Sequence, residues 1–122
     1  MGSLLENAHI VVERRQCARA LLGCPVMLKS TQGTMVGKII DISIGGAFIC
    51  CKKPLGLEES LEMQFRASPS SPTLVALGKV VRSNVHCLDG QASCHGMGIQ
   101  FTELSAHGRA IITDIVENGT RV

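Results

Sequence analysis

The chain has 122 residues, of which 45% are hydrophobic, 18% are charged and 2% are aromatic. This apolar content is enough for a hydrophobic core and excludes an intrinsically disordered chain, and the length without a long polar linker predicts a single domain. The formal net charge of +2 is too small for a broad basic face, so we expect no nucleic acid polymer as a partner.

The sequence has no segment that approaches the ~18 consecutive apolar residues of a membrane-spanning helix, so we expect no direct membrane insertion. Residues 1–12 lack a basic leader followed by an apolar core. We therefore expect a cytoplasmic protein whose six cysteines are mostly reduced. Several of them are interpreted as small hydrophobic residues, namely Cys17, Cys24, Cys50 and Cys51.

Taken in chain order, the pattern begins with weak periodicity at residues 1–13, which we predict to be a flexible N-terminal arm. Runs rich in β-branched and alternating apolar residues follow, separated by turn signals such as Gln32-Gly33 and Asp89-Gly90. The predicted strands cover residues 25–30, 35–42, 47–50, 61–66, 74–87 and 94–102.

The apolar spacing changes at residue 103 from alternation to the period of a helix, which is predicted to extend to residue 118. Thr102 is the predicted N-cap of this helix, and Gly119 suits a C-terminal cap. Several antiparallel strands followed by one amphipathic helix imply a small barrel that the helix plugs or packs against.

Two short motifs occur in this pattern, one near the start of the chain and one after the first two predicted strands. Residues 15–19 read RxxxR and are preceded by Arg14, and residues 41–46 read DxSxxG. Taken alone, each has an ordinary interpretation: an arginine cluster is usually a solvated face, and Asp, Ser and Gly are common in turns. In this order and separation, together with the strand pattern, they resemble the signature of PilZ domains, which bind the bacterial second messenger cyclic di-GMP.

The resemblance extends from about residue 13 to about residue 118. It includes residues 78–82, similar to the family's late barrel strand, and residues 96–101, similar to its closing strand. It implies an all-β fold, a six-stranded antiparallel PilZ-type barrel with a C-terminal helix, over residues 14–119. It also implies a non-catalytic bacterial receptor whose ligand is cyclic di-GMP and which needs no cofactor.

Two arginines match the RxxxR residues that grip guanine and phosphate in the family, Arg15 and Arg19. Three residues match the DxSxxG positions that complete the pocket, Asp41, Ser43 and Gly46. Arg14 occupies the position where a basic residue favours capture of an intercalated ligand dimer. Arg82 stands where many family members carry a flat side chain against a guanine.

The chemistry of these residue types agrees with that ligand. A guanidinium group meets O6 and N7 of guanine or a phosphate with two hydrogen bonds, and it stacks on a purine face. Asp41 is an acceptor for the N1–H and N2–H₂ donors of guanine, and Ser43 donates a hydrogen bond or fixes its own turn. Gly45 and Gly46 allow positive φ and close approach of a ligand to the backbone.

Other functional assignments find little support in the sequence. His86-Cys87 and Cys94-His95 flank the Asp89-Gly90 turn, but adjacent residues of a strand point to opposite faces, so we expect no metal site. No nucleophile, base and orienting residue can be proposed together, so we expect no enzyme. The expected partners are cyclic di-GMP and an unidentified downstream protein. The alternative is a PilZ-like interaction scaffold that does not bind nucleotide.

Overall fold

The computed structural model describes residues 19–89 and 92–118. The predicted arm at residues 1–13 and the predicted cap Gly119 therefore lie outside the described residues. Within the described part, six strands are followed by one helix. They are β1 (Ala20–Ser30), β2 (Gly33–Ile42), β3 (Gly46–Cys51), β4 (Ser60–Phe65), β5 (Leu74–Asp89), β6 (Ala92–Leu104) and α2 (Ala106–Asn118).

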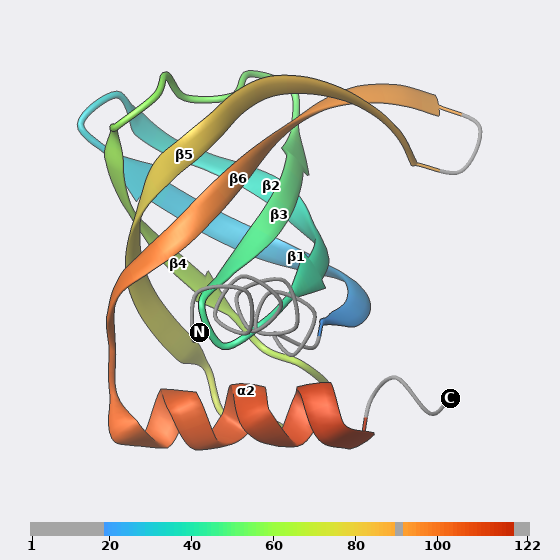
Figure 1. The fold of residues 1–122 in the computed structure, drawn as a ribbon, viewed down its shortest axis with the longest axis vertical. Coiled ribbons are helices and arrows are strands. Elements are labelled where there is room, and N and C mark those ends of the chain that lie inside the picture. The colour runs from blue at the N-terminus through green and yellow to red at the C-terminus, as the bar shows by residue number, and fades with distance from the viewer. Residues whose placement is uncertain (1–18, 90–91, 119–122) are drawn as a thin grey trace, which may run out of the picture.

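The strands form a closed barrel in the order β1-β2-β3-β6-β5-β4 (Figure 1), and every neighbouring pair is antiparallel. Closure leaves no unpaired edge along the sheet. Helix α2 lies across one end of this barrel (Figure 1). The predicted fold class, all-β with a C-terminal helix, is confirmed.

Each predicted strand is present, but several are longer than the alternation indicated. Strand β1 begins at Ala20 rather than at residue 25, because a register shift between Leu21 and Cys24 interrupts the apolar alternation there. Gly23 has φ of 67° at this irregularity, a conformation that glycine adopts without strain. The alternation rule cannot follow a strand through such a bulge.

The start of the helix also differs from the prediction. Residues 103 and 104 continue β6, where they pair with Leu77 and Ala76, and α2 begins at Ala106. The N-cap is Ser105, whose Oγ accepts a hydrogen bond of 2.9 Å from the backbone N–H of Gly108. The prediction of Thr102 as N-cap was therefore wrong, because the last turn signal before the helix lies three residues later.

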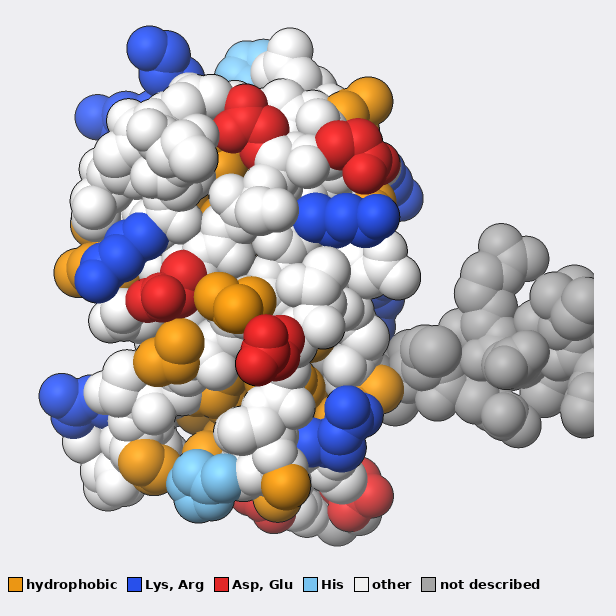
Figure 2. Space-filling model, turned by 90° about the vertical axis from the view of Figure 1, so that its left-hand side faces the viewer, with side chains coloured by type: hydrophobic (Ala, Val, Ile, Leu, Met, Phe, Trp, Pro, Cys, Tyr) orange, Lys and Arg blue, Asp and Glu red, His pale blue; other side chains and the backbone are white. Residues whose placement is uncertain are grey.

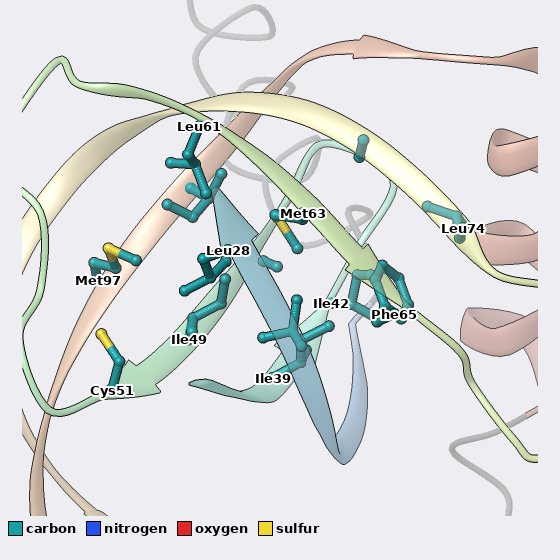
Figure 3. Packing of buried hydrophobic residues seen from close by; sticks show 14 of the residues in the cluster. Leu28, Ile39, Ile42, Ile49, Cys51, Leu61, Met63, Phe65, Leu74 and Met97 are labelled. Carbon is teal, nitrogen blue, oxygen red and sulfur yellow. The ribbon is translucent and has the colours of Figure 1, made fainter. Parts of the chain in front are cut away.

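The core fills the barrel interior with aliphatic side chains from all six strands (Figure 3). Leu28, Ile39, Ile49, Met63 and Met97 are almost fully buried there. Helix α2 packs against β1 and β5 and contributes Ile112, which is 0% exposed, so its apolar face closes one end of the core. This rigid interior fixes the outer face of the strands, where side chains that point away from the core are available to ligands.

Two of the cysteines interpreted as small hydrophobic residues, Cys50 and Cys51, are buried. Burial also raises the pKa of the half-buried Cys24 thiol above its ordinary value. All three are therefore at least partly shielded from solvent. Cys17 lies outside the described residues.

On the face shown in Figure 2, acidic and basic side chains are interspersed, with hydrophobic side chains between them. This mixture gives that face no extended basic surface of the kind that binds nucleic acid polymers. The described part of the chain contains no helix that is both long enough and apolar enough to cross a bilayer.

Candidate functional site

Strand pairing brings Arg19, the last residue of the RxxxR motif, close to the DxSxxG motif. Leu21 near the start of β1 lies opposite Asp41 near the end of β2. Arg19 precedes Leu21 by two residues, so its side chain projects from the same outer face of the sheet as Asp41. Nη1 of Arg19 lies 2.5 Å from Oδ1 of Asp41, a hydrogen-bonded ion pair between residues 22 positions apart in the sequence.

The two members of this pair are exposed to different degrees. The side chain of Arg19 is 60% exposed, whereas that of Asp41 is 21% exposed. Asp41 is thus fixed between β1 and β3, where it pairs with Phe48, while Arg19 reaches it from the solvent side. The carboxylate is held by the sheet, and the more exposed guanidinium is the partner that a ligand displaces more easily.

The DxSxxG motif forms the tight turn between β2 and β3. The N–H of Ser43 donates to the carbonyl oxygen of Gly46 at 2.8 Å, and the N–H of Gly46 donates back to Ser43 at 3.4 Å. Ser43 Oγ accepts from the N–H of Gly45 at 3.3 Å and donates to the Gly46 carbonyl oxygen at 3.4 Å. Ser43 is 6% exposed and its hydroxyl bonds within the turn, so the side chain stabilises the turn.

The two glycines of the motif correct one expectation. In the described part of the chain, the glycines with positive φ are Gly23 and Gly33. The φ angles at positions 45 and 46 therefore do not require glycine. Gly46 is instead required by packing, because a Cβ there would lie 2.0 Å from the carbonyl oxygen of Ile99 on β6. A Cβ on Gly45 would meet no atom within 4 Å, so packing does not require glycine at this position.

A groove of about 680 Å³ lies over this turn on the outer face of β2, β3, β6 and β5. Its volume is in the range of small-molecule sites. Every predicted site residue that the structure describes lines it: Arg19, Asp41, Ser43, Gly45, Gly46 and Arg82. Arg14 and Arg15 lie outside the described residues.

Arg82 reaches the groove because β5 is irregular at this point. The β5–β6 register shifts on both sides of Arg82, and Asn84 has φ of 56°. As a result both Val81 and Arg82 are exposed, although consecutive residues of a regular strand point to opposite faces. Both line the groove. The bulge therefore aims a cation at the side of the groove opposite Arg19.

The groove also contains residues that sequence reasoning missed, chiefly Phe48, Gly98 and Gln100. Phe48 was detectable, because Ala47 and Ile49 alternate with it as inward-facing residues, which leaves an aromatic ring on the outer face directly after the turn. Gly98 and Gln100 were placed correctly on the face of their strand opposite Met97 and Ile99. The pattern did not show that β6 pairs with β3 and β5, which places these residues beside Phe48 and Arg82.

The histidines near the β5–β6 turn contact each other. His86 pairs with His95 across the two strands, and their ring centroids lie 6.0 Å apart in an edge-on arrangement. Cys87 and Cys94 are also paired in register. Among the residues that the structure describes, no group of three or more His, Cys, Asp or Glu is placed to hold a metal ion.

A family model for the PilZ domain matches residues 13–118. The chain belongs to the PilZ domain family. This PilZ chain has no match among curated proteins at the level of its sequence.

The fold is similar to that of several solved structures. The inhibitor of motility MotI/DgrA from Bacillus subtilis aligns with a TM-score of 0.70 at 18% identity, over 87% of this chain and 50% of that one. The chain thus spans about half the length of that protein. The PilZ domain of YcgR from Escherichia coli, a structure with cyclic di-GMP, aligns with a TM-score of 0.68 at 13% identity, over 84% of this chain and 88% of that one.

A third similar structure is the PilZ domain of CeSA from a cellulose-synthesizing bacterium. It aligns with a TM-score of 0.58 at 16% identity, over 81% of this chain and 94% of that one. At these identities the likeness concerns the fold. The residues of this chain must therefore carry the argument about its ligand.

Proposed function

We propose that this PilZ domain is a cytoplasmic bacterial receptor for cyclic di-GMP. The observation that carries the proposal is the meeting of Arg19 and Asp41, one residue from each motif, in a single groove that Arg82 also lines. Membership of the PilZ family supports the ligand class, and the YcgR domain is a relative by fold whose structure contains cyclic di-GMP.

The groove offers complementary charges to both parts of the ligand. Asp41 is fixed and partly shielded, so its carboxylate is suited to accept the N1–H and N2–H₂ donors of one guanine. Arg19 and Arg82 offer donor forks for O6 and N7 of guanine or for phosphate oxygens. This arrangement distinguishes guanine from other bases, because the carboxylate requires the N–H donors of guanine and the guanidinium groups require its O6 and N7 acceptors.

Binding requires that the ion pair between Arg19 and Asp41 breaks and that each residue forms hydrogen bonds to the ligand instead. An exposed ion pair contributes about 0–1 kcal/mol, and Arg19 is 60% exposed. A hydrogen bond between a charged group and a buried ligand contributes about 1.5–3 kcal/mol. The exchange therefore favours the ligand, and the ion pair keeps both groups in place until it arrives.

Arg14 and Arg15 precede Arg19 by five and four positions. Because an extended chain covers at most about 3.3–3.6 Å per residue, the Cα of Arg15 lies within about 14 Å of that of Arg19. Their side chains are thus able to reach the same groove. We propose that they close over the ligand, and that the new surface is what a downstream protein recognises.

The proposal is tested by titration calorimetry with cyclic di-GMP on wild type, Arg19→Ala, Arg15→Ala and Lys53→Ala. Lys53 is an exposed cation that does not line the groove, so its variant controls for the loss of one positive charge. We expect Arg19→Ala and Arg15→Ala to weaken binding at least tenfold, and Lys53→Ala to leave it within about twofold. Equal affinities in all four proteins would contradict the proposal. An absence of binding to wild type would favour the scaffold alternative.

A further inference from the structure

The outer face of β1, β4 and β5 carries a row of residues joined by strand pairing. Met27 of β1 lies opposite Gln64 of β4, and Gln64 lies opposite Val75 of β5. Directly opposed residues of antiparallel strands project from the same face, so these three side chains form one row on the outside of the barrel. Leu77 lies two residues after Val75 on β5 and projects from the same face.

Three apolar side chains on this face are exposed to solvent. The exposed fractions are 40% for Met27, 48% for Val75 and 38% for Leu77. Single apolar residues are normal on a protein surface, whereas neighbouring ones that form a patch mark interaction sites. Strand β4 is already paired with β1 and β5, so a partner cannot add a strand here and must contact the side chains.

Two residues of opposite charge flank the row along β4. Glu62 lies two positions before Gln64, and the exposed Arg66 lies two positions after it. Oε2 of Glu62 accepts a hydrogen bond of 2.6 Å from Nε2 of Gln64, and Nη1 of Arg66 donates to the carbonyl oxygen of Pro69 at 3.1 Å. A carboxylate has a second oxygen and a guanidinium has five N–H donors, so both groups have capacity for a further partner.

This order of charges matches itself after a two-fold rotation. An axis along the row of Met27, Gln64 and Val75 brings each of these residues onto its own copy and makes the two β4 strands antiparallel. The same rotation places Arg66 of each copy over Glu62 of the other, which gives two equivalent ion pairs. A symmetric dimer uses the same surface patch on both copies, so its interface requires this kind of self-complementarity.

We propose that this surface is a symmetric dimer interface between two copies of the chain. We call it the β4 face, and it consists of Met27, Glu62, Gln64, Arg66, Val75 and Leu77. The apolar side chains form its centre, and the two ion pairs fix the register of the two copies.

The dimer leaves the candidate ligand groove of each copy accessible. In the barrel order β1-β2-β3-β6-β5-β4, strands β1 and β4 lie diametrically opposite β6 and β3, over which the groove is centred. The proposed dimer is therefore independent of the proposed function, and a failure of one does not affect the other.

The size of the β4 face predicts a weak dimer. Two residues along a strand cover about 6.8 Å and neighbouring strands lie about 4.8 Å apart, so a patch on three strands is small. Specific interfaces at the low end of the size range bury less than about 1,200 Å² in total. We expect a dissociation constant on the order of 100 μM, which sedimentation equilibrium measures at protein concentrations from about 10 μM to about 1 mM.

The first test uses the full chain without nucleotide, in reducing buffer because the chain contains six cysteines. Val75→Glu places two like charges across the two-fold axis and should weaken dimerisation at least tenfold. Val81→Glu is the matched control, because Val81 is 39% exposed on the same strand but lines the groove. Its dimerisation should stay within about twofold of wild type.

The second test exchanges the charges. Arg66→Glu and Glu62→Arg each place like charges together in both ion pairs, so each variant alone should dimerise at least tenfold more weakly than wild type. An equimolar mixture of the two variants should associate as wild type does. In the mixed dimer the two new charges face each other in one ion pair, and the two native charges face each other in the other.

Three results would overturn the proposal. Wild type that remains monomeric up to about 1 mM has no such interface. Equal effects of Val75→Glu and Val81→Glu would exclude the β4 face as the surface of contact. A mixture of the two charge variants that stays monomeric would exclude the contact between Arg66 and Glu62. If melting curves show that Val75→Glu does not fold, the charge variants decide the result.

Discussion

At the scale of single residues, the DxSxxG motif combines structural and ligand-directed positions that the sequence does not separate. Ser43 holds the turn with its hydroxyl and its backbone, and Gly46 is demanded by contact with β6. The carboxylate of Asp41 contacts Arg19 rather than the turn, and a Cβ on Gly45 would meet no atom within 4 Å; both residues line the groove. The motif could be recognised from residue types, but this division required the position of Ile99 on a distant strand.

Asp41→Ala tests the ligand-directed part of the motif. Removal of the carboxylate should cost about 1.5–3 kcal/mol of binding free energy to cyclic di-GMP, the value of a hydrogen bond to a charged group. Stability should change by no more than about 1 kcal/mol, because the lost ion pair with Arg19 is exposed. Affinity and melting temperature are measured on the same sample. If neither changes, Asp41 does not take part in ligand binding.

Gly46→Ala tests the structural part, with Gly45→Ala as its neighbour and control. The new methyl group at residue 46 would overlap the Ile99 carbonyl oxygen, so we expect a loss of at least about 1–3 kcal/mol in the free energy of unfolding. At residue 45 the methyl group enters open space, and the loss should be below about 0.5 kcal/mol. Urea unfolding of both variants makes the comparison, and equal losses would contradict the packing argument.

At the scale of the elements, the alternation of apolar residues predicted every strand, because each one buries a single face in the barrel. The predicted strand boundaries are wrong where a strand departs from the regular pleat. The irregularity at Gly23 hid the first part of β1, and the one around Arg82 exposed two consecutive residues of β5. The irregularity around Arg82 lies at the groove, which both Val81 and Arg82 line.

The junction of β6 and α2 provides a test of local structure. Ser105→Ala removes the oxygen that caps the first turn of the helix, so we expect a loss of about 0.5–2 kcal/mol in stability. Thr102→Ala, at the position that the sequence suggested as the cap, lies on the exposed face of β6 and should cost less than about 0.5 kcal/mol. Chemical denaturation distinguishes the two. A larger effect at Thr102 would contradict the observed helix start.

At the scale of the whole molecule, the fold was predictable and the full site was not. Strand periodicity followed by one helix implied a barrel, and the family resemblance supplied six strands and most of the site residues. Gly98 was missed because the site is assembled by pairing between β3, β5 and β6, segments far apart in the sequence, whereas the alternation after the turn made Phe48 detectable. Residues 14 and 15 lie outside the described part, so their role remains a prediction.

The arginine cluster leads to a prediction of stoichiometry. Arg14, Arg15 and Arg19 provide three cations for a ligand that carries two phosphate charges, an excess better matched by a stacked ligand pair with four. Wild type should therefore bind two molecules of cyclic di-GMP per chain at saturation, and Arg14→Leu should bind closer to one with binding retained. Calorimetric stoichiometry measures both. A one-to-one isotherm for both proteins would exclude a role for Arg14 in dimer capture.

The central claim is that this groove recognises guanine edges. The most direct measurement is the titration of wild-type protein with cyclic di-GMP and with cyclic di-AMP in the same buffer. Adenine presents an amino donor where guanine has O6, and this donor would face the guanidinium groups and leave hydrogen-bonding groups unpaired. We predict that cyclic di-GMP binds and that cyclic di-AMP binds at least a hundredfold more weakly. Equal binding of the two cyclic dinucleotides would contradict the account.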